Sequence, residues 1–495
     1  MVRLVSSQAA LEADRAAETV FGYPPWLLME EAGIRLQDRL ERLQAEGALP
    51  GGPVVYLAGS GNNGGDALVM ARQAFLRGRL GVTVVRVFPA SSDSCRRQDA
   101  LVRALKVPSW DWGSDEAHEA LVSASVWVDG IWGTGLQGPL RPERGAVLRE
   151  LETLRTRTPA PCVAIDVPSG LWEGFVPGDP VLTGAWTLTP GWLKDFCFYP
   201  EAREAAGNLI EAPLAFPRPA TGSAELLDAS DLAALLPRVG PSDYKGRRGH
   251  VGVVGGATGM TGALVLAARA AAASGAGLVS IGTDSDLVVL VAPQVPSFQV
   301  RPTADLAGLA ARYNSLVVGP GWGRSDGRME LLRALWATDL PLVVDADALT
   351  AWKAAGLPGR KAPVVLTPHP GEFARLRTEA GAPVPAASAL ARERQVTVVL
   401  KGSVTWVLAP DGRRSVWDGR NPALGTGGSG DCLAGVVGAL LARGLDGYEA
   451  ARAAVALHGV AGRDLADLDG WFTAERLPGA LARRAAACMA GLGPL

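Results

Sequence analysis

One pattern recurs in both halves of the chain and limits its possible folds: a short apolar segment, a loop rich in Gly with Asp or Asn, and then a helical segment. The segments expected to form strands are residues 53–58, 82–88, 125–129, 162–166 and 185–189, and then 251–254, 278–281, 315–318, 342–344, 364–366 and 396–400. Strands that alternate with helices predict a parallel sheet covered by helices, whose ligands bind at the carboxyl ends of the strands. We therefore expect a three-layer α/β fold in each half, with functional residues in the loops that follow strands.

The length of the chain and one proline-rich stretch predict the domain organisation. A chain of 495 residues exceeds one ordinary hydrophobic core, so two or three domains are expected. Pro213, Pro217, Pro219 and Gly222 indicate a connector, because proline fixes φ and lacks an amide hydrogen. We place the boundary between 215 and 225, which gives domains of residues 1–218 and 225–495. Residues 6–46 are expected to form two helices, the second over 26–44.

Composition excludes several classes of protein. The formal net charge of −2 argues against a nucleic-acid binder. The N-terminal residues carry charges throughout, and no run reaches the ~18 uncharged apolar residues of a membrane span. Five scattered cysteines and four dispersed histidines indicate neither a disulfide framework nor a zinc site. We expect a cytoplasmic protein of small-molecule substrates, with no nucleic-acid or membrane partner.

Three Gly-rich loops follow strands in the first half. They are residues 61–66, 129–139 and 165–170, and each holds Asp or Asn beside its glycines. One such loop by itself is most often a tight turn. Three at successive strand ends indicate a site, whose backbone amides suit phosphate and whose side-chain oxygens suit a cation.

The second half contains a different glycine cluster, at Gly425, Gly427, Gly428 and Gly430, directly before an apolar helix. Glycines let the backbone turn its amides inward, so this segment predicts an anion site at a helix N-terminus. Asp431 follows it and is interpreted either as a helix N-cap or as a base that takes a proton from a hydroxyl attacking phosphate.

Other strand ends of the second half hold charged candidates. Asp345 and Asp347 are interpreted in two ways, with neither favoured: their carboxylates belong to the second shell around Mg²⁺, or they cap the next helix. His369, between two prolines, lies either in a surface turn or rigidly before a ligand. Lys401 follows a buried strand, where its ammonium can reach a nucleotide phosphate.

The first half resembles the NAD(P)H-hydrate epimerase domain. The resemblance rests on residues 28–33, 61–66, 133–136 and 166–170, and it implies a Rossmann-like three-layer sandwich. It also implies a potassium ion held by Asn63, Asp129 and Ser169, and Asp166 as the acid/base at the nicotinamide ring. The residues implied in binding the hydrated nucleotide are Asn62, Asn63, Gly64, Gly65, Asp66, Gly133, Thr134, Gly135, Leu136, Gln137, Gly138, Pro139 and Asp166. Ala67 and Gly130 depart from the family pattern, which bears on substrate affinity more than on activity.

The second half resembles the ADP-dependent NAD(P)H-hydrate dehydratases, which have a ribokinase-like three-layer α/β/α fold. The resemblance rests on residues 243–246, 259–263, 274–279, 345–349 and 367–372 together with the glycine cluster. It implies that the hydrated dinucleotide contacts Ala263, Gly321, His369 and Asp431, and that ADP contacts Lys401, Gly402, Ser403, Val404, Thr405 and Gly430. Leu424, Gly425 and Cys432 depart from the family pattern and leave the anion-binding core intact.

Together the two resemblances imply a bifunctional repair enzyme that uses K⁺ in the first domain and Mg²⁺ and ADP in the second. It would exchange the R and S hydrates of NADH and NADPH and dehydrate the S form, and it would self-associate into a homo-oligomer. A ribokinase-like small-molecule kinase fused to a non-catalytic binding module is the alternative. The choices between ADP and ATP and between the two hydrates, the oligomeric state and any communication between the sites stay open.

Overall fold

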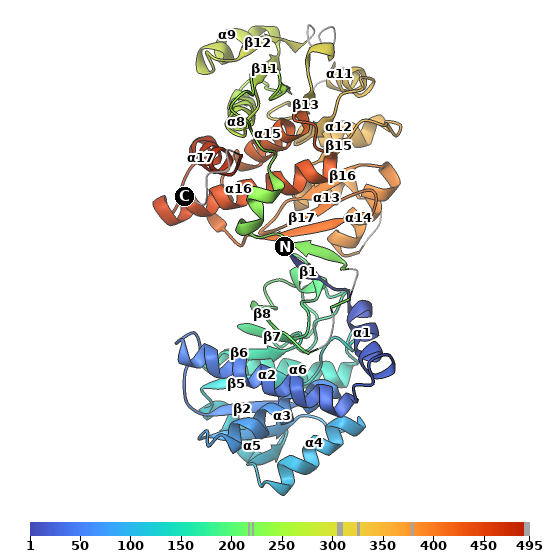
Figure 1. Ribbon diagram of the computed structural model, residues 1–495, viewed down its shortest axis with the longest axis vertical. Coiled ribbons are helices and arrows are strands. Elements are labelled where there is room, and N and C mark those ends of the chain that lie inside the picture. The colour runs from blue at the N-terminus through green and yellow to red at the C-terminus, as the bar shows by residue number, and fades with distance from the viewer. Residues whose placement is uncertain (216–217, 220–221, 304–309, 324–326, 378–380, 490–495) are drawn as a thin grey trace. The chain divides into compact units, whose positions relative to one another are not determined.

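The computed structural model describes residues 1–215, 218–219, 222–303, 310–323, 327–377 and 381–489. The chain divides into two compact units, shown in Figure 1. We call Arg3–Ser223 the N-terminal unit, and Met1–Val2 with Ala224–Leu495 the C-terminal unit. Each is described by itself.

A parallel sheet of seven strands forms the centre of the N-terminal unit, in the order β4-β3-β2-β5-β6-β7-β8. The strands are β2 (Val54–Ala58), β3 (Val82–Arg86), β4 (Ser109–Asp111), β5 (Val126–Gly130), β6 (Cys162–Ile165), β7 (Trp186–Pro190) and β8 (Asn208–Ala212). Strand order reverses between β2 and β5, because β2 pairs with β3 on one side and with β5 on the other. Loops diverge at such a point, which leaves a crevice beyond the carboxyl ends of these two strands.

Two apolar layers cover the faces of this sheet. On one face lie α2 (Pro25–Ala45), α3 (Asn62–Leu76) and α4 (Asp93–Ala104), and on the other lie α5 (Asp115–Ser123) and α6 (Pro142–Thr156). The first helix, α1 (Ser7–Thr19), packs Ala10 and Ala13 near Trp192, which follows β7. The unit is therefore a three-layer sandwich, and α1 lies beside the segment that leaves β7.

The C-terminal unit is built on a sheet of eleven strands in the order β1-β9-β18-β17-β16-β15-β14-β13-β10-β11-β12. The strands are β1 (Val2–Leu4), β9 (Ala224–Leu226), β10 (His250–Val254), β11 (Leu278–Thr283), β12 (Gln299–Pro302), β13 (Ser315–Val318), β14 (Leu342–Val344), β15 (Val364–Leu366), β16 (Thr397–Leu400), β17 (Val404–Leu408) and β18 (Arg414–Asp418). From β12 to β16 the strands are parallel, whereas β17 is antiparallel to both of its neighbours.

Helices cover both faces of this sheet as well (Figure 1). The largest apolar cluster joins one face to α8 (Thr261–Ala273), α15 (Ser429–Ala442), α16 (Gly447–Asp469) and α17 (Leu477–Met489). On the other side lie α11 (Gly327–Trp336), α12 (Asp347–Ala355), α13 (Pro370–Leu376) and α14 (Pro383–Arg394). This unit is thus a second three-layer α/β/α sandwich. No described helix is both long and apolar enough to cross a membrane.

The β17–β18 hairpin was not predicted from the sequence. Its strands are short and separated by a turn at Asp411 and Gly412, and they break the strand–helix alternation that identified the others. As a result, Val404 and Thr405 lie in β17 rather than in a loop.

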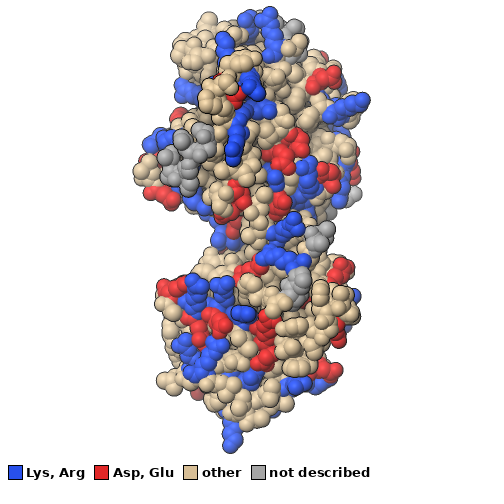
Figure 2. Space-filling view, viewed as in Figure 1, with Lys and Arg blue, Asp and Glu red and all other residues tan. Residues whose placement is uncertain are grey.

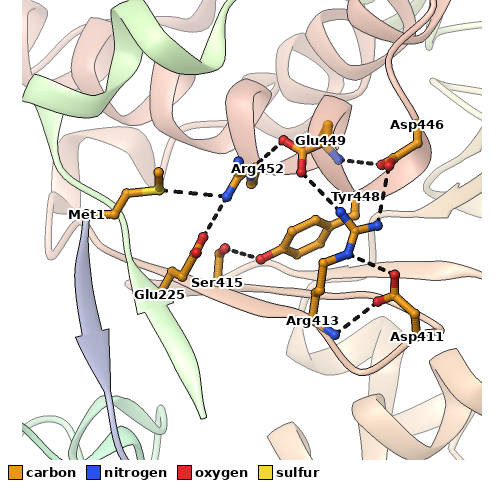
Figure 3. Close-up of polar contacts among 9 residues, drawn as sticks. All are labelled: Met1, Glu225, Asp411, Arg413, Ser415, Asp446, Tyr448, Glu449 and Arg452. Carbon is orange, nitrogen blue, oxygen red and sulfur yellow. Dashed lines mark hydrogen bonds and ion pairs between the residues drawn. The ribbon is translucent and has the colours of Figure 1, made fainter. Parts of the chain in front are cut away.

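A polar network joins the outer strands of this sheet to α16 (Figure 3). The Tyr448 ring lies under two guanidinium groups, with Arg413 at 4.5 Å and Arg452 at 5.4 Å from the ring centroid. Arg452 donates to Glu225 of β9 at 2.6 Å and to Glu449 at 2.7 Å. These contacts hold the position of a helix that also lines the cavity described below.

Charged side chains of both signs are interspersed over the visible face of each unit (Figure 2). This distribution matches the formal net charge of −2. The electrostatic field that acts on a bound ligand is therefore set by the charged residues close to it, at the strand ends.

Candidate functional sites

Asn63 occupies the first turn of α3, at the switch point of the N-terminal sheet. Residues 61–66 were expected to form a loop, but the helix begins at Asn62, with Gly61 as its N-cap. A Cβ on Gly64 would lie 2.0 Å from the Gly59 carbonyl oxygen, so only glycine allows the helix to start so close to β2. Asn63 is buried and donates through Nδ2 to the Ile165 carbonyl at 3.3 Å. Its Oδ1 lies close to Gly133: a Cβ built on Gly133 would be 3.1 Å from this oxygen.

Asp129, near the end of β5, and Ser169, in the loop after β6, form a buried pair. Ser169 donates to the Asp129 carboxylate through its hydroxyl at 2.5 Å and its backbone amide at 2.8 Å, and the Ile131 amide donates at 3.1 Å. Burial raises the pKa of Asp129 to about 6, although the bonds from Ser169 act in the opposite direction. Together with Asn63 these side chains supply one carboxylate and neutral oxygens, a donor set that suits a hard monovalent cation.

Asp166, directly after β6, is held on both of its carboxylate oxygens. Its Oδ2 accepts from the Thr134 amide and the Thr134 hydroxyl, each at 2.7 Å. Its Oδ1 forms an ion pair with Lys194. The backbone has φ of 68°, a left-handed conformation that a non-glycine residue adopts only where its surroundings impose it. A Cβ on Gly133 would lie 2.6 Å from Oδ2, so this position must be glycine.

The structure therefore brings Asn63, Gly133, Thr134 and Asp166 together. Gly135, Gln137 and Pro139 of the same predicted loop are exposed and extend along the surface. Gly64 and Gly65 serve the close packing of α3, where a Cβ on Gly65 would lie 2.4 Å from the Met29 methyl carbon.

Two charged residues of this cluster were missed by sequence reasoning. Lys194 is only 4% exposed, and Asp14 comes from α1. Asp14 is open to solvent on one side, yet the surrounding protein raises its pKa to about 6, with Lys194 acting against the shift. Burial, and then the charges of Asp166 and Asp14, raise the pKa of Asp66 well above its ordinary value. The one available signal was a lysine within the apolar segment 192–198.

In the C-terminal unit a cavity of about 760 Å³ brings most of the predicted nucleotide residues together. Its lining includes His369, Lys401, Gly402, Ser403, Thr405 and Gly430 from the predicted set, and also Trp417, Asn421, Leu424, Leu433, Val455, His458 and Gly459. Val404 is buried within β17 and does not belong to this lining. The lining from α16 had no signal in the sequence, because only the tertiary fold brings that helix to the glycine cluster.

The glycine cluster turns the chain into the N-terminus of α15. Gly428 is the N-cap residue with φ of 94°, and Asp431 is the third residue of the helix. Asp431 is therefore not the N-cap. Burial raises the pKa of Asp431 to about 7, the Asp345 carboxylate acts in the same direction, and Lys401 acts against both.

Lys401 extends from the end of β16 to the glycine cluster. A Cβ on Gly430 would lie 3.1 Å from its Nζ, which also donates to Asp345 at 2.9 Å. Burial by itself lowers the pKa of Lys401, but the carboxylates of Asp345 and Glu372 outweigh it and raise the pKa. The prediction that Asp345 or Asp347 caps the next helix was wrong. The N-cap residue of α12 is Ala346, and no side chain at the N-cap accepts a hydrogen bond from the first-turn amides of this helix.

His369 is the N-cap of α13 and also lines the cavity. Its Nδ1 accepts from the Gly371 amide at 3.1 Å, and Glu372 accepts from the His369 amide at 2.9 Å in return. Ala263 and Gly321 lie beside each other, since a Cβ on Gly321 would be 3.2 Å from that of Ala263. Neither is among the residues that line the 760 Å³ cavity, so they belong to a neighbouring part of the strand ends.

Two family models match the chain, in the order of its two units. Residues 27–196 match the model described as YjeF-related protein N-terminus, and residues 251–482 match the model described as NAD(P)H-hydrate dehydratase.

Curated relatives align along nearly the whole chain. The bifunctional NAD(P)H-hydrate repair enzyme Nnr of Moorella thermoacetica is 33% identical over 500 residues, covering 94% of this chain and 92% of that protein. The protein of the same name from Mycobacterium tuberculosis H37Rv is 36% identical over 455 residues, covering 89% of this chain and 90% of its own. Among solved structures, a ribokinase-like superfamily protein from Enterococcus faecalis V583 is 25% identical with a TM-score of 0.51, covering 55% of this chain and 99% of that one. With the two sheet orders, this similarity confirms the predicted fold class.

Proposed function

The chain belongs to the bifunctional NAD(P)H-hydrate repair enzymes, and from that premise we propose which residues carry its two reactions. Its N-terminal domain is the epimerase and its C-terminal domain is the dehydratase. The alternative of a small-molecule kinase fused to a binding module is thereby set aside.

We propose that Asp431 is the base of the dehydratase. It takes the proton of the C6 hydroxyl of the S hydrate, and the oxygen then attacks the terminal phosphate of ADP, which leaves AMP and a phosphorylated C6 oxygen. The C6–O bond then breaks to release phosphate, and loss of a proton from C5 restores the C5–C6 double bond. Phosphate is a far better leaving group than hydroxide, so phosphoryl transfer drives the elimination.

One observation carries this proposal: a helix N-terminus and a lysine line one cavity, and a carboxyl with a raised pKa, Asp431, is next in the chain to a lining residue, Gly430. The amides before α15 and the ammonium of Lys401 suit the charge that moves onto phosphate, and Asp431 stands one residue beyond Gly430. Mg²⁺, when bound, would neutralise phosphate charge, and the phosphates would hold it mainly, because Asp345 is already paired with Lys401. Lys401, Gly402, Ser403 and Thr405 would contact ADP, and Ala263, Gly321 and His369 would contact the hydrate.

In the epimerase domain we propose Asp166 as the group that moves protons at C6, with Asn63, Gly133 and Thr134 around the nicotinamide end. The oxygens of Asn63, Asp129 and Ser169 would hold K⁺, which supplies positive charge that stabilises the adjoining loops. The support is the oxygen-only donor set and the position of Asp166 at the switch point.

The phosphoryl donor, the range of hydrates, the location and the oligomeric state are proposed as well. We propose ADP as the phosphoryl donor, both NADH and NADPH hydrates as substrates, and a cytoplasmic homo-oligomer with no nucleic-acid or membrane partner. Size-exclusion chromatography with light scattering tests the oligomeric state, and initial rates with ADP and ATP test the donor.

The direct test incubates the protein with mixed R and S hydrates of NADH, Mg²⁺, K⁺ and ADP. Absorbance of reduced nicotinamide and released phosphate are followed together. We expect both epimers to return to NADH with one phosphate per molecule. Recovery that stops when the S form is consumed would remove the epimerase assignment, and failure with both nucleotides would remove the dehydratase assignment.

A further inference from the structure

Lys194 holds the carboxylate oxygen of Asp166 that Thr134 does not hold. Its side chain is 5% exposed, and its ammonium forms an ion pair with Asp166 Oδ1. None of the Gly-rich loops that identify the site contains it. A lysine is rarely this buried unless it is paired, so the pair is a specific feature of this site.

The backbone on both sides of Lys194 is fixed. The Val5 amide donates to the Leu193 carbonyl at 3.0 Å, and the Asp195 amide donates to the Val5 carbonyl at 2.9 Å. The Cys197 amide donates to the Lys194 carbonyl at 3.3 Å, at the start of a short 3-10 helix (Asp195–Phe198). The ammonium is thus presented to Asp166 from a rigid segment.

Asp166 lies near two other carboxyl groups. Those of Asp14 on α1 and Asp66 on α3 are close enough to act on it electrostatically. Thr134 holds only Oδ2, so the orientation of the carboxylate about its own axis depends on what holds Oδ1. Lys194 supplies both the second anchor and the positive charge.

We propose that Lys194 is a positioning residue of the epimerase site: through its ion pair with Oδ1, its ammonium holds the Asp166 carboxylate in the orientation that takes the proton of the C6 hydroxyl. The inference rests on the proposed role of Asp166. In this transfer the hydroxyl O–H bond breaks and an O–H bond forms on Asp166. The electron pair left on oxygen forms a C6=O bond as the C6–N1 bond breaks with its pair on N1, and reclosure on the other face of C6 with return of the proton gives the other epimer. Lys194 acts only through its ion pair with Asp166.

The test is a double-mutant cycle in the full-length protein, with Lys194→Met, Asp166→Asn and both together. Purified R hydrate with ADP, Mg²⁺ and K⁺ reports epimer exchange followed by dehydration, and purified S hydrate reports dehydration by itself. Exchange without protein is subtracted. We expect Lys194→Met to lower kcat for the R hydrate about ten- to a hundredfold with KM nearly unchanged, and to leave the S-hydrate rate unchanged. In the Asp166→Asn background the lysine substitution should have no further effect.

Independent, multiplying losses from the two substitutions would overturn the proposal, and so would a change in KM alone. An Asp166→Asn variant with normal exchange would instead remove the proposed role of Asp166, which the cycle reports separately. Arg86→Met is the matched control, because Arg86 is a buried cation that pairs with Asp99 at 2.7 Å in the same unit. It should lower the melting temperature without lowering kcat.

If the Lys194→Met variant does not fold, Lys194→Arg tests the role of the ammonium instead. It restores the charge in a different shape, so we expect kcat between those of wild type and the Asp166→Asn variant, again with KM unchanged. A folded arginine variant with no more exchange than Asp166→Asn would contradict a role through charge.

Discussion

Burial shifts the pKa values of two titratable residues of the C-terminal unit in opposite directions, raising that of Asp431 and lowering that of His458. Asp431 lies between the Asp345 carboxylate, which disfavours its ionised form, and the Lys401 ammonium, which favours it. His458 has no such cation or anion to pair with among its described contacts, and only its Nε2 bonds to the Ser429 carbonyl at 3.0 Å. Because that carbonyl can only accept, the Nε2 nitrogen carries the hydrogen.

We expect kcat/KM for dehydration of the S hydrate to rise with pH through about 7. Burial raises the pKa of Asp431 to about 7, and a base accepts a proton only when it is ionised. In Lys401→Met the cation that favours the ionised carboxyl is gone, so the rising limb should move to higher pH. Lys353→Met, on α12, is the control and should leave the profile in place. A profile that is flat across neutral pH would argue against Asp431 as the base.

His458 should make stability depend on pH. Burial lowers its pKa to about 4, so between about pH 6.5 and 4 the unfolded chain binds a proton that the folded unit does not. The free energy of unfolding should therefore fall by about 3 kcal/mol as pH drops through that window. Asp431, with a raised pKa, acts in the opposite direction, so the measurement is the difference between wild type and His458→Gln in denaturant titrations. An equal loss in both proteins would contradict the assignment.

At the scale of elements, α16 supports the cavity through glycines that admit large side chains. A Cβ on Gly459 would lie 2.3 Å from the Trp417 ring, and one on Gly462 would lie 2.6 Å from the Leu424 side chain. Trp417 and Leu424 both line the cavity. The close approach of helix and strand therefore sets the shape of this wall.

Gly459→Ala should reduce nucleotide affinity and stability together. The new methyl group displaces the Trp417 ring, and overpacking of this kind costs about 1–3 kcal/mol. We expect a higher KM for ADP and a lower melting temperature. Gly479→Ala, in α17, has only the end of Arg483 within 4 Å, at 3.8 Å, and is the matched control. An unchanged KM for ADP would show that Trp417 does not shape the nucleotide site.

At the scale of the whole molecule, the residues proposed for the two reactions belong to two different compact units. Asp431→Asn should abolish recovery of NADH while leaving R and S exchange intact, because Asp431 belongs to the C-terminal unit. Chiral chromatography or NMR of the hydrates measures that exchange without the dehydratase. Loss of exchange in this variant would mean that the epimerase depends on the second site.

The sequence by itself determined the central strands of both sheets and the Gly-rich loops that follow them, but not the strands β1, β4, β8, β9 and β12 or the β17–β18 hairpin. Residues 315–318, 342–344 and 364–366 coincide with β13, β14 and β15, because short apolar runs between Gly-rich loops are a local signal. For the same reason Gly133, Asp166 and the glycines before α15 could be identified as candidates. The start of α3 at Asn62 was missed, since tertiary contacts with β2 and not local propensity decide where that helix begins.

Only the tertiary structure decided which side chains meet. Lys194 reaches Asp166 from 28 positions away, and His458 reaches Ser429 from 29. The antiparallel β17–β18 pair sets one wall of the cavity. Pro410, Asp411 and Gly412 between two apolar runs are a local turn signal for this hairpin, but only the tertiary fold brings it to the cavity. Local sequence patterns record backbone preferences, whereas ion pairs and cavity walls depend on how distant elements pack. The fold and the Gly-rich loops at the strand ends were therefore readable from the chain, and the ion pair of Lys194 with Asp166 and the walls of the cavity were not.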